Sequence, residues 1–287
     1  MQTLEFIQSF SSPFLDNFFI AITTLGEESI YIFLLTLIYW CIDKKYGFQL
    51  SFTILFSSVA NNVIKALFKS PRPLDIEHLR HLRVETATGH SFPSGHTQTT
   101  ATFYGFIMKK HNKVWLYIVC SIVIFLVAVS RLYLGVHWPK DVLVGALLGV
   151  GIAFLFEYLF RQPKSIGQKY ILMILLIPFT LCLLIFNDSA DLYKSCGLFF
   201  GFLLGYSIED KYIQFNPKTQ LPKQIIKYIF GLVVALILKS VLKSMFPKTL
   251  ISDFIRYFIL GIWITLIAPY LFKVLHLSGY KSRNHQS

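Results

Sequence analysis

The sequence carries little charge, and it lacks the basic start of a cleaved signal peptide. Only 15% of its 287 residues are Asp, Glu, Lys or Arg, whereas a soluble domain carries about 25%. Several apolar stretches approach the roughly 20 residues that a helix needs to cross a bilayer. Because the first ten residues hold no basic cluster, we expect the chain to keep its N-terminus. The low charge therefore excludes an ordinary soluble domain and favours a polytopic helical membrane protein.

Cysteine is also scarce, and its placement excludes a disulfide framework and a zinc site. The four cysteines, Cys41, Cys120, Cys182 and Cys196, lie in or beside apolar segments. They have no CxxC spacing and no histidine cluster beside them, so they indicate neither a disulfide framework nor a zinc site. We expect four isolated buried thiols.

Basic residues outnumber acidic ones, 27 to 15, but their distribution does not indicate nucleic acid as a partner. They fall in short loops between apolar runs, which is typical of the loops of membrane proteins. We therefore expect the lipid bilayer, and no nucleic acid, as the partner.

Nine apolar runs follow a mixed N-terminal segment. Residues 1–25 space their apolar positions as a surface helix does, so we expect an amphipathic helix at the membrane interface. The runs lie at approximately 28–42, 48–68, 95–108, 114–131, 141–160, 170–186, 195–208, 225–245 and 253–273. The expected fold class is all-α, a polytopic transmembrane helical bundle of about nine spans.

Nine spans would place alternate loops on opposite sides of the membrane. One set is rich in Lys and Arg and comprises the loops at 43–47, 109–113, 161–169 and 209–227 with the C-terminal tail. The positive-inside rule puts this set, and hence the C-terminus, in the cytoplasm of a multi-pass cell-membrane protein. Loops 69–94 and 132–140 then open together on the extracytoplasmic side.

The first of three polar clusters on that side surrounds Arg72. Lys65 lies near the end of its apolar run, and Pro71 and Pro73 bracket Arg72 and keep the stretch extended. Taken alone, the cluster is also consistent with a lysine that snorkels to the interface beside a proline loop.

The second cluster is the stretch FPSGHTQTT at 92–100. Ser94 can cap a helix that begins after Pro93, and Gly95 permits close approach to the backbone. The free N–H groups and positive dipole end of this helix would form an anion site, with His96 in the first turn. The alternative is ordinary capping of a transmembrane helix, with His96 as an interfacial histidine.

The third cluster is SRLYLGVHWPKD at 130–141. Arg131 ends one apolar run and Asp141 begins the next, and a helical start would put His137 and Asp141 on one face. A carboxylate bonded to one imidazole nitrogen fixes the tautomer and leaves the other nitrogen free to react. The alternative is an aromatic-belt Trp138 beside a surface ion pair.

Ionisable groups at span ends cost free energy unless they are paired or serve a function, so the three clusters together indicate a functional site. Their chemistry is also coherent. A cage for a dianionic phosphate would be built from Lys65, Arg72, Arg131 and the helix start at Ser94. His137, held by Asp141, would then attack phosphorus, and His96 would protonate the leaving oxygen.

These residues resemble the motifs of the type 2 phosphatidic acid phosphatase superfamily, which also includes glucose-6-phosphatase and vanadium haloperoxidases. The matching motifs are Lys65-x6-Arg72-Pro73, Pro93-Ser94-Gly95-His96 and Ser130-Arg131-x5-His137-x3-Asp141. The resemblance covers about residues 14–160. It predicts a phosphatase core at 28–160, preceded by the interfacial helix at 1–27 and followed by additional transmembrane helices and a cytoplasmic tail at 161–287.

The resemblance implies a role for each motif residue. His137 would be the nucleophile that forms a phosphohistidine, Asp141 would orient it, and His96 would be the general acid and later the base that activates water. The phosphoryl oxygens would be held by Lys65, Arg72, Ser94, Gly95 and Arg131. The family needs no metal, and we expect no metal or other cofactor here, because the cationic cage can do the electrostatic work.

The expected substrate is a lipid phosphate or lipid pyrophosphate monoester, hydrolysed at the extracytoplasmic face. Candidates are phosphatidic acid, phosphatidylglycerophosphate, a sphingoid phosphate and polyprenyl pyrophosphate. A lipid phosphotransferase would use the same intermediate with another acceptor, and a soluble sugar phosphate is a third option. A transporter or an inactive scaffold is the non-enzyme alternative, but the sequence shows no pair of broken helices in corresponding halves.

Loop 74–91 adds further basic residues near the predicted site, namely His78, Arg80, His81, Arg83 and His90. These side chains would either bind a lipid headgroup or belong to a solvated loop whose charge has no role in binding.

Overall fold

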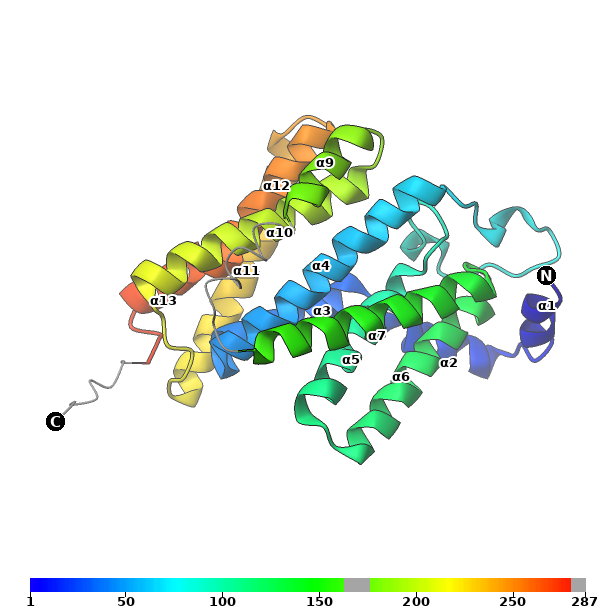
Figure 1. Cartoon of the computed structure of the whole chain (residues 1–287), viewed down its shortest axis with the longest axis horizontal. Coiled ribbons are helices and arrows are strands. Elements are labelled where there is room, and N and C mark those ends of the chain that lie inside the picture. The colour runs from blue at the N-terminus through cyan, green and yellow to red at the C-terminus, as the bar shows by residue number, and fades with distance from the viewer. Residues whose placement is uncertain (163–175, 280–287) are drawn as a thin grey trace. The chain divides into compact units, whose positions relative to one another are not determined.

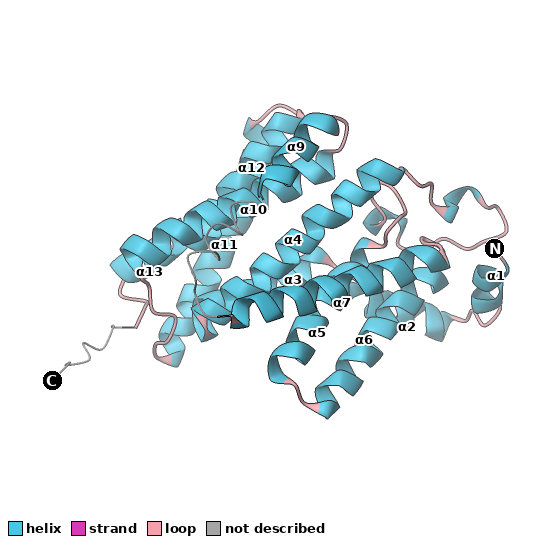
Figure 2. Ribbon diagram, viewed as in Figure 1, coloured by secondary structure: helices cyan, strands magenta, loops and turns pink. Residues whose placement is uncertain are grey.

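The computed structural model describes residues 1–162 and 176–279, and the regular elements in these ranges are all helical (Figure 2). The all-α prediction is confirmed. Most of the predicted loop at 161–169, the start of the predicted run at 170–186 and the end of the C-terminal tail lie outside the described residues.

The chain forms two compact units. The first comprises Met1–Tyr31 and Thr53–Leu192, and the second comprises Ile32–Phe52 and the chain from Tyr193 onward. All the predicted site residues belong to the first unit. The predicted domain boundaries at 27–28 and 160–161 stay a prediction.

The first unit is built from helices that can be followed in chain order (Figure 1). They are α1 (Gln2–Gln8), α2 (Pro13–Thr24), the start of α3 (Glu28–Leu37), most of α4 (Lys44–Phe68), α5 (Gly95–His111), α6 (Val114–Tyr133), α7 (Pro139–Arg161) and α9 (Leu176–Ile185). Helix α5 packs against both α6 and α7. The long loop between α4 and α5 and the short turn between α6 and α7 carry the polar clusters.

Glycines bring α7 close to α5. A Cβ atom at Gly145 would lie 2.8 Å from the carbonyl oxygen of Ser94, and one at Gly149 would lie 2.5 Å from that of Gln98. Small residues allow this kind of backbone approach between membrane helices. As a result the starts of the two helices meet, and the Ser94 amide donates to the Asp141 carbonyl at 3.0 Å.

A buried polar network ties α4 to α5. The Gln98 side chain donates to the carbonyl oxygen of Ser57 at 3.0 Å and accepts from Asn61 at 2.8 Å. The hydroxyl groups of Ser57 and Thr102 lie 2.8 Å apart. Because unpaired polar groups are costly in the membrane, this network fixes the register between the two helices, and with it the position of Lys65 one turn after Asn61.

The N-terminal segment differs from the single amphipathic helix that the sequence predicts, because Ser12 and Pro13 start a second helix. The Ser12 hydroxyl accepts from the Leu15 amide at 3.3 Å, which caps α2. Both α1 and α2 pack on α6, and the Gln8 side chain donates to the carbonyl oxygen of Tyr133 at 3.0 Å. Its placement at the membrane interface stays a prediction.

The second unit contains the remainder of α3, which continues as a π-helical turn, and the first residues of α4. It continues with most of α10 (Ala190–Ile208), α11 (Leu221–Met245), α12 (Leu250–Ile262) and α13 (Ala268–Val274). Glycines again permit close helix contact, because a Cβ at Gly201 would lie 2.1 Å from the carbonyl oxygen of Phe258. Lys44 pairs with the buried Glu209 at 3.0 Å.

Five described helices are long and apolar enough to cross a membrane, namely α4, α6, α7, α11 and the continuous stretch Leu250–Val274. A sixth span results if α2 and α3, which are bent by 45° relative to each other, count as one. Helices occupy the predicted apolar runs wherever the structure describes them, so the chain is a multi-pass membrane protein. The count of nine spans is not confirmed.

Candidate active site

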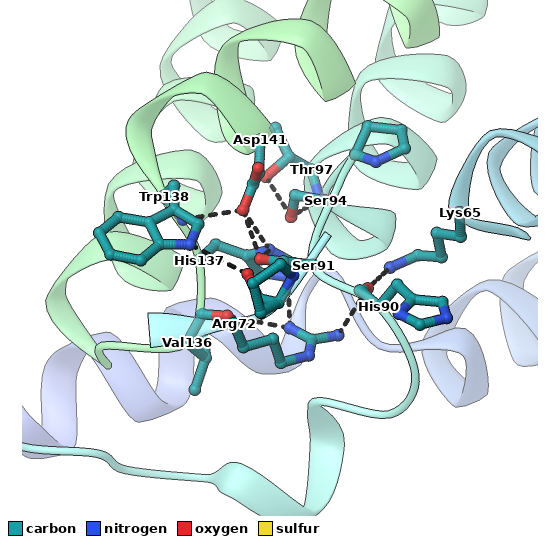
Figure 3. Close-up of polar contacts among 12 residues, drawn as sticks. Lys65, Arg72, His90, Ser91, Ser94, Thr97, Val136, His137, Trp138 and Asp141 are labelled. Carbon is teal, nitrogen blue, oxygen red and sulfur yellow. Dashed lines mark hydrogen bonds and ion pairs between the residues drawn. The ribbon is translucent and has the colours of Figure 1, made fainter. Parts of the chain in front are cut away.

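The three predicted polar clusters meet at one end of the first unit (Figure 3). Lys65 comes from the last turn of α4, and His137 and Asp141 flank the start of α7. Arg72 reaches from the α4–α5 loop to within 3.0 Å of the His137 ring. Residues distant in sequence therefore surround one imidazole, as the motifs predict.

The neighbours of His137 determine its tautomer. Arg72 Nη1 lies 3.0 Å from Nε2, and since a guanidinium only donates, Nε2 accepts. Asp141 Oδ2 lies 3.3 Å from Nδ1, and since a carboxylate only accepts, Nδ1 carries the proton. This tautomer puts the reactive lone pair on Nε2, on the side of the cationic residues.

The His137 imidazole is kept neutral by its surroundings. It is 1% exposed, and burial lowers its pKa well below the usual value. The positive charges of Arg72, Arg131 and Lys65 lower this pKa further. A neutral imidazole is the form that can act as a nucleophile.

Asp141 is fully buried, and one of its oxygens collects several donors. The Trp138 amide donates to Oδ2 at 2.9 Å, and the Ser91 hydroxyl donates to the same atom. The Trp138 contact also caps α7, whose first residue is Pro139. The carboxylate is therefore fixed by the helix start itself and by a loop residue that the sequence motifs do not include.

Arg72 is held by backbone carbonyl groups rather than by a carboxylate. Its guanidinium donates to Thr88 at 2.7 Å, Gly89 at 3.0 Å and Val136 at 2.9 Å. Burial lowers its pKa to about 10, so the group stays charged at neutral pH. The α4–α5 loop thus holds the Arg72 guanidinium in place with uncharged carbonyl groups, which leave its positive charge available to a ligand.

Arg131 and His96 present buried nitrogen atoms without a partner among the described residues. Arg131 is 0% exposed, and its Nη1 donates to the Thr23 hydroxyl at 2.8 Å. Its Nε and Nη2, and Nε2 of His96, find no hydrogen-bond partner within residues 1–162 and 176–279. Because buried polar atoms are normally paired, these nitrogens fit a site that receives an anionic ligand.

Helix α2 and the bend that follows it contact the site, which the sequence does not predict. Thr23 on α2 contacts Arg131, and a Cβ at Gly26 would lie 3.1 Å from Cβ of His96 and 3.2 Å from its Cδ2. The bend between α2 and α3 therefore packs directly on the His96 ring. No motif spacing signals these residues, because they lie far from the site residues in sequence.

The remaining phosphate-binding candidates lie at the same end. Ser94 caps α5 through the Thr97 amide at 3.5 Å, and Gly95 is the first residue of this helix. Lys65 Nζ donates to the carbonyl oxygen of His90. The role of this helix start and of Lys65 in holding a phosphate stays a prediction.

Most of the basic residues in loop 74–91 contact the protein itself. Arg80 pairs with Asp16 at 2.5 Å, and Arg83 pairs with Glu27 at 2.5 Å. The other two pairs are His78 with Glu5 at 2.8 Å and His81 with the carbonyl oxygen of Gly135 at 2.9 Å. These contacts tie the loop to α1, to α2 and to the α6–α7 turn, which favours a structural role over headgroup reading.

No group of three or more His, Cys, Asp and Glu side chains that would hold a metal ion occurs in the described part of the chain. The expected metal independence stays a prediction.

Two protein-family models match the chain. The PAP2 superfamily model matches residues 46–165, and the model for the PAP2 superfamily phosphatase transmembrane extension matches residues 193–281. The first match includes all the predicted site residues.

Curated relatives include an undecaprenyl-diphosphatase of Sulfolobus acidocaldarius, which is 35% identical over 112 residues. That alignment covers 39% of this chain and 54% of the relative, so the chain spans about half of that protein's length. Phosphatidylglycerophosphatase B of Bacillus subtilis is 32% identical over 171 residues, which cover 55% of this chain and 81% of the relative. Among solved structures, Aquifex aeolicus LpxE is similar with a TM-score of 0.48 and 28% identity, over 54% of this chain and 92% of that one.

Proposed function

Because this chain belongs to the PAP2 superfamily, as its motifs predict, we propose that it is an integral membrane phosphatase of lipid phosphate or pyrophosphate monoesters. The observation that carries the proposal is a buried imidazole whose Nδ1 lies against the Asp141 carboxylate and whose Nε2 lies 3.0 Å from the Arg72 guanidinium. Arginine and lysine at this position suit the oxygens of a phosphoryl group.

The first step is binding of the phosphoryl group. Its oxygens would take hydrogen bonds from Lys65, Arg72 and Arg131 and from the amide groups at the start of α5. Arg72 would exchange its contact with His137 Nε2 for one with a phosphoryl oxygen, which frees the lone pair. The unpartnered nitrogens of Arg131 support this assignment, because a phosphoryl group would pair them.

The second step is transfer to the histidine. Nε2 of His137 forms a bond to phosphorus while the bond between phosphorus and the ester oxygen breaks. His96 gives its proton to the leaving oxygen, and Asp141 stabilises the positive charge on the phosphorylated imidazole. A bound phosphate dianion favours the protonated form of His96 that this role requires.

The third step is hydrolysis of the phosphohistidine. His96, now neutral, takes a proton from water as the water oxygen bonds to phosphorus and the nitrogen–phosphorus bond breaks. Inorganic phosphate leaves, and His137 returns to its neutral Nδ1–H form. In this scheme the cationic residues and the helix start stabilise the transition-state charge without a metal.

A lipid substrate is favoured because the site lies at the ends of α4, α6 and α7, which are long and apolar enough to span a membrane. A site at the end of the spans lies at the depth of lipid headgroups, so a lipid can present its phosphate there while its tails stay in the leaflet. The names of the two relatives, an undecaprenyl-diphosphatase and a phosphatidylglycerophosphatase, both denote lipid phosphatases and support the same class. We place the site on the extracytoplasmic side, because the opposite loops carry the excess of basic residues.

The experiment that tests the proposal is phosphate release from a panel of substrates by the purified protein. Phosphatidic acid, phosphatidylglycerophosphate, a sphingoid phosphate and a polyprenyl pyrophosphate are presented in detergent micelles, with a sugar phosphate as the water-soluble comparison. We expect release from at least one lipid without an added acceptor, and none above the His137→Ala blank from the sugar phosphate. Release that requires an acceptor hydroxyl indicates a phosphotransferase instead, and no release from any lipid contradicts the proposal.

A further inference from the structure

Ser91 lies at the centre of the site, although it belongs to none of the predicted motifs. Its side chain is fully buried, and its amide donates to the carbonyl oxygen of Ser70 at 2.9 Å. This backbone contact joins Ser91 to the stretch that carries Arg72. Its hydroxyl group reaches the other half of the site, where it contacts both members of the His137–Asp141 pair (Figure 3).

The number of protons on these three side chains determines the direction of each hydrogen bond. Ser91 has one hydroxyl proton, and the ionised Asp141 carboxylate only accepts, so that proton goes to Oδ2. Ser91 Oγ therefore turns a lone pair toward His137 Nδ1, which lies 3.3 Å away. Nδ1 must then carry the imidazole proton, because two lone pairs facing each other in a buried site would repel.

Asp141 alone would hold the ring weakly. The separation of 3.3 Å between Nδ1 and Oδ2 is longer than the range of about 2.7–3.2 Å in which N–H···O bonds are strongest. The Nδ1 proton is instead shared between Asp141 and Ser91, which lie at the same distance from it. The orientation of the ring thus depends on both acceptors, and on Arg72 at the opposite nitrogen.

We propose that Ser91 is a positioning residue for phosphoryl transfer, whose hydroxyl group locks His137 in the Nδ1–H tautomer and fixes the Asp141 carboxylate beside it. The inference rests on the proposed phosphatase function. Ser91 acts through its two neighbours, and the phosphate-binding cations do not depend on it for a hydrogen bond.

The first test is steady-state kinetics of Ser91→Ala. Loss of an outer partner of a reacting group typically costs about 10–100-fold in activity. We expect kcat to fall by roughly this factor while KM stays within about threefold, because Lys65, Arg72 and Arg131 keep their positions. An unchanged kcat overturns the proposal.

A matched pair separates the hydroxyl group from packing. Ser91→Thr adds one methyl group and keeps the hydroxyl. Ser91→Val has the same shape but carries a methyl group in place of the hydroxyl, so crowding affects both variants alike. We expect Ser91→Thr to exceed Ser91→Val in kcat by about tenfold or more. Equal rates for the two variants, at equal amounts of folded protein by size-exclusion chromatography, show that only packing matters and overturn the proposal.

A spectroscopic readout tests the tautomer without any substrate. In protein labelled with ¹⁵N-histidine, the nitrogen shifts report which ring nitrogen carries the proton, and the His137→Ala spectrum identifies the signals of this residue. We expect a single Nδ1–H form in the unaltered chain and a mixture of tautomers in Ser91→Ala. A pure Nδ1–H form in Ser91→Ala overturns the proposal whatever the rate. If the unaltered protein releases no phosphate from any lipid, the proposed function fails, whereas this readout still tests Ser91.

Discussion

At the scale of single residues, the proposed mechanism assigns bond formation to one side chain, His137, and charge stabilisation to others. His137 is neutral and touches Asp141 on one side and Arg72 on the other. The Arg72 guanidinium lies on the Nε2 side, where a phosphoryl group would bind in the proposed mechanism. We therefore expect substitution of His137 to lower kcat, and substitution of a cation to lower kcat/KM and to shift its pH dependence.

Removal of the nucleophile tests the first part of this division. We expect His137→Ala to lower kcat by at least about 10³-fold, because covalent catalysis has no route without the imidazole. The assay is phosphate release from the best lipid substrate. His78→Ala is the matched control, since His78 is exposed and pairs with Glu5 outside the site, and it should leave the rate within about twofold. Retained activity in His137→Ala would assign the nucleophile elsewhere.

The pH profile tests the charges around His137. Burial and three cations lower the pKa of this imidazole below 6.5, so we expect the acidic limb of kcat/KM to lie below that pH. Arg72→Gln removes one positive neighbour, which makes protonation easier, so the pKa rises and the acidic limb moves to higher pH. The variant should also lose about 10²-fold or more in kcat/KM.

Arg80→Gln is the control for this profile, because Arg80 pairs with Asp16 on the N-terminal side of the loop. Its acidic limb should coincide with that of the unaltered protein. A limb that stays in place in Arg72→Gln would mean that Arg72 does not act on the imidazole electrostatically.

The cationic cage also makes a prediction about metals. In the proposed mechanism, Lys65, Arg72 and Arg131 supply the positive charge that a phosphoryl transition state needs. We therefore expect EDTA to leave phosphate release unchanged, measured after dialysis against the chelator. Strong loss of activity that Mg²⁺ restores would contradict the metal-free mechanism.

At the scale of elements, the bend between α2 and α3 is the least expected part of the site. The sequence assigns this segment to the membrane surface, yet Gly26 packs on His96 and Thr23 bonds to Arg131. Helix α2 therefore supports two functional side chains that come from α5 and α6. A glycine suits this bend, because a Cβ at Gly26 would lie 3.1 Å from Cβ of His96, which is closer than ordinary van der Waals contact.

Substitution of this glycine should displace His96, the proposed general acid. A Cβ at Gly26 would lie 3.1 Å from Cβ of His96 and 3.1 Å from Cγ1 of Val127, so one of the neighbours must move. We expect Gly26→Ala to lower kcat by about tenfold and to destabilise the protein by about 1–3 kcal/mol, as overpacking does. Steady-state kinetics and thermal unfolding in detergent measure the two effects.

Gly151→Ala is the matched control, since a Cβ at Gly151 on α7 meets no atom within 4 Å. This change should leave kcat unaltered and should stabilise the helix slightly. Equal kinetics for the two alanine variants would show that the bend does not position His96.

At the scale of the whole molecule, one boundary between the two compact units coincides with the start of the match to the transmembrane extension. The first unit ends at Leu192, and the transmembrane extension begins at residue 193. The site residues all belong to the first unit, so the chemistry can be understood from that unit by itself. The second unit has its own core of helices, with Lys44 paired to a buried Glu209.

We predict that the whole molecule lies in the membrane with the loop of the site outside the cell and the basic loops in the cytoplasm. In a background without the four native cysteines, Glu77→Cys places a thiol in the loop of the site and Lys113→Cys places one in a basic loop, and both positions are exposed. We expect a membrane-impermeant maleimide added to intact cells to label Glu77→Cys and not Lys113→Cys, because basic loops stay in the cytoplasm. The reverse pattern would place the site on the cytoplasmic side.

The sequence by itself determined the helical class, the apolar runs and the three motifs, because helix periodicity, hydropathy and short spacings are local properties. It could predict that His137 and Asp141 share a face, since four residues separate them at a helix start. Only the tertiary structure decided that Ser91, Thr23 and Gly26 belong to the site. Their contacts join segments between 46 and 108 residues apart, and the direction of a side chain in a loop or at a bend follows from packing rather than from any period in the sequence.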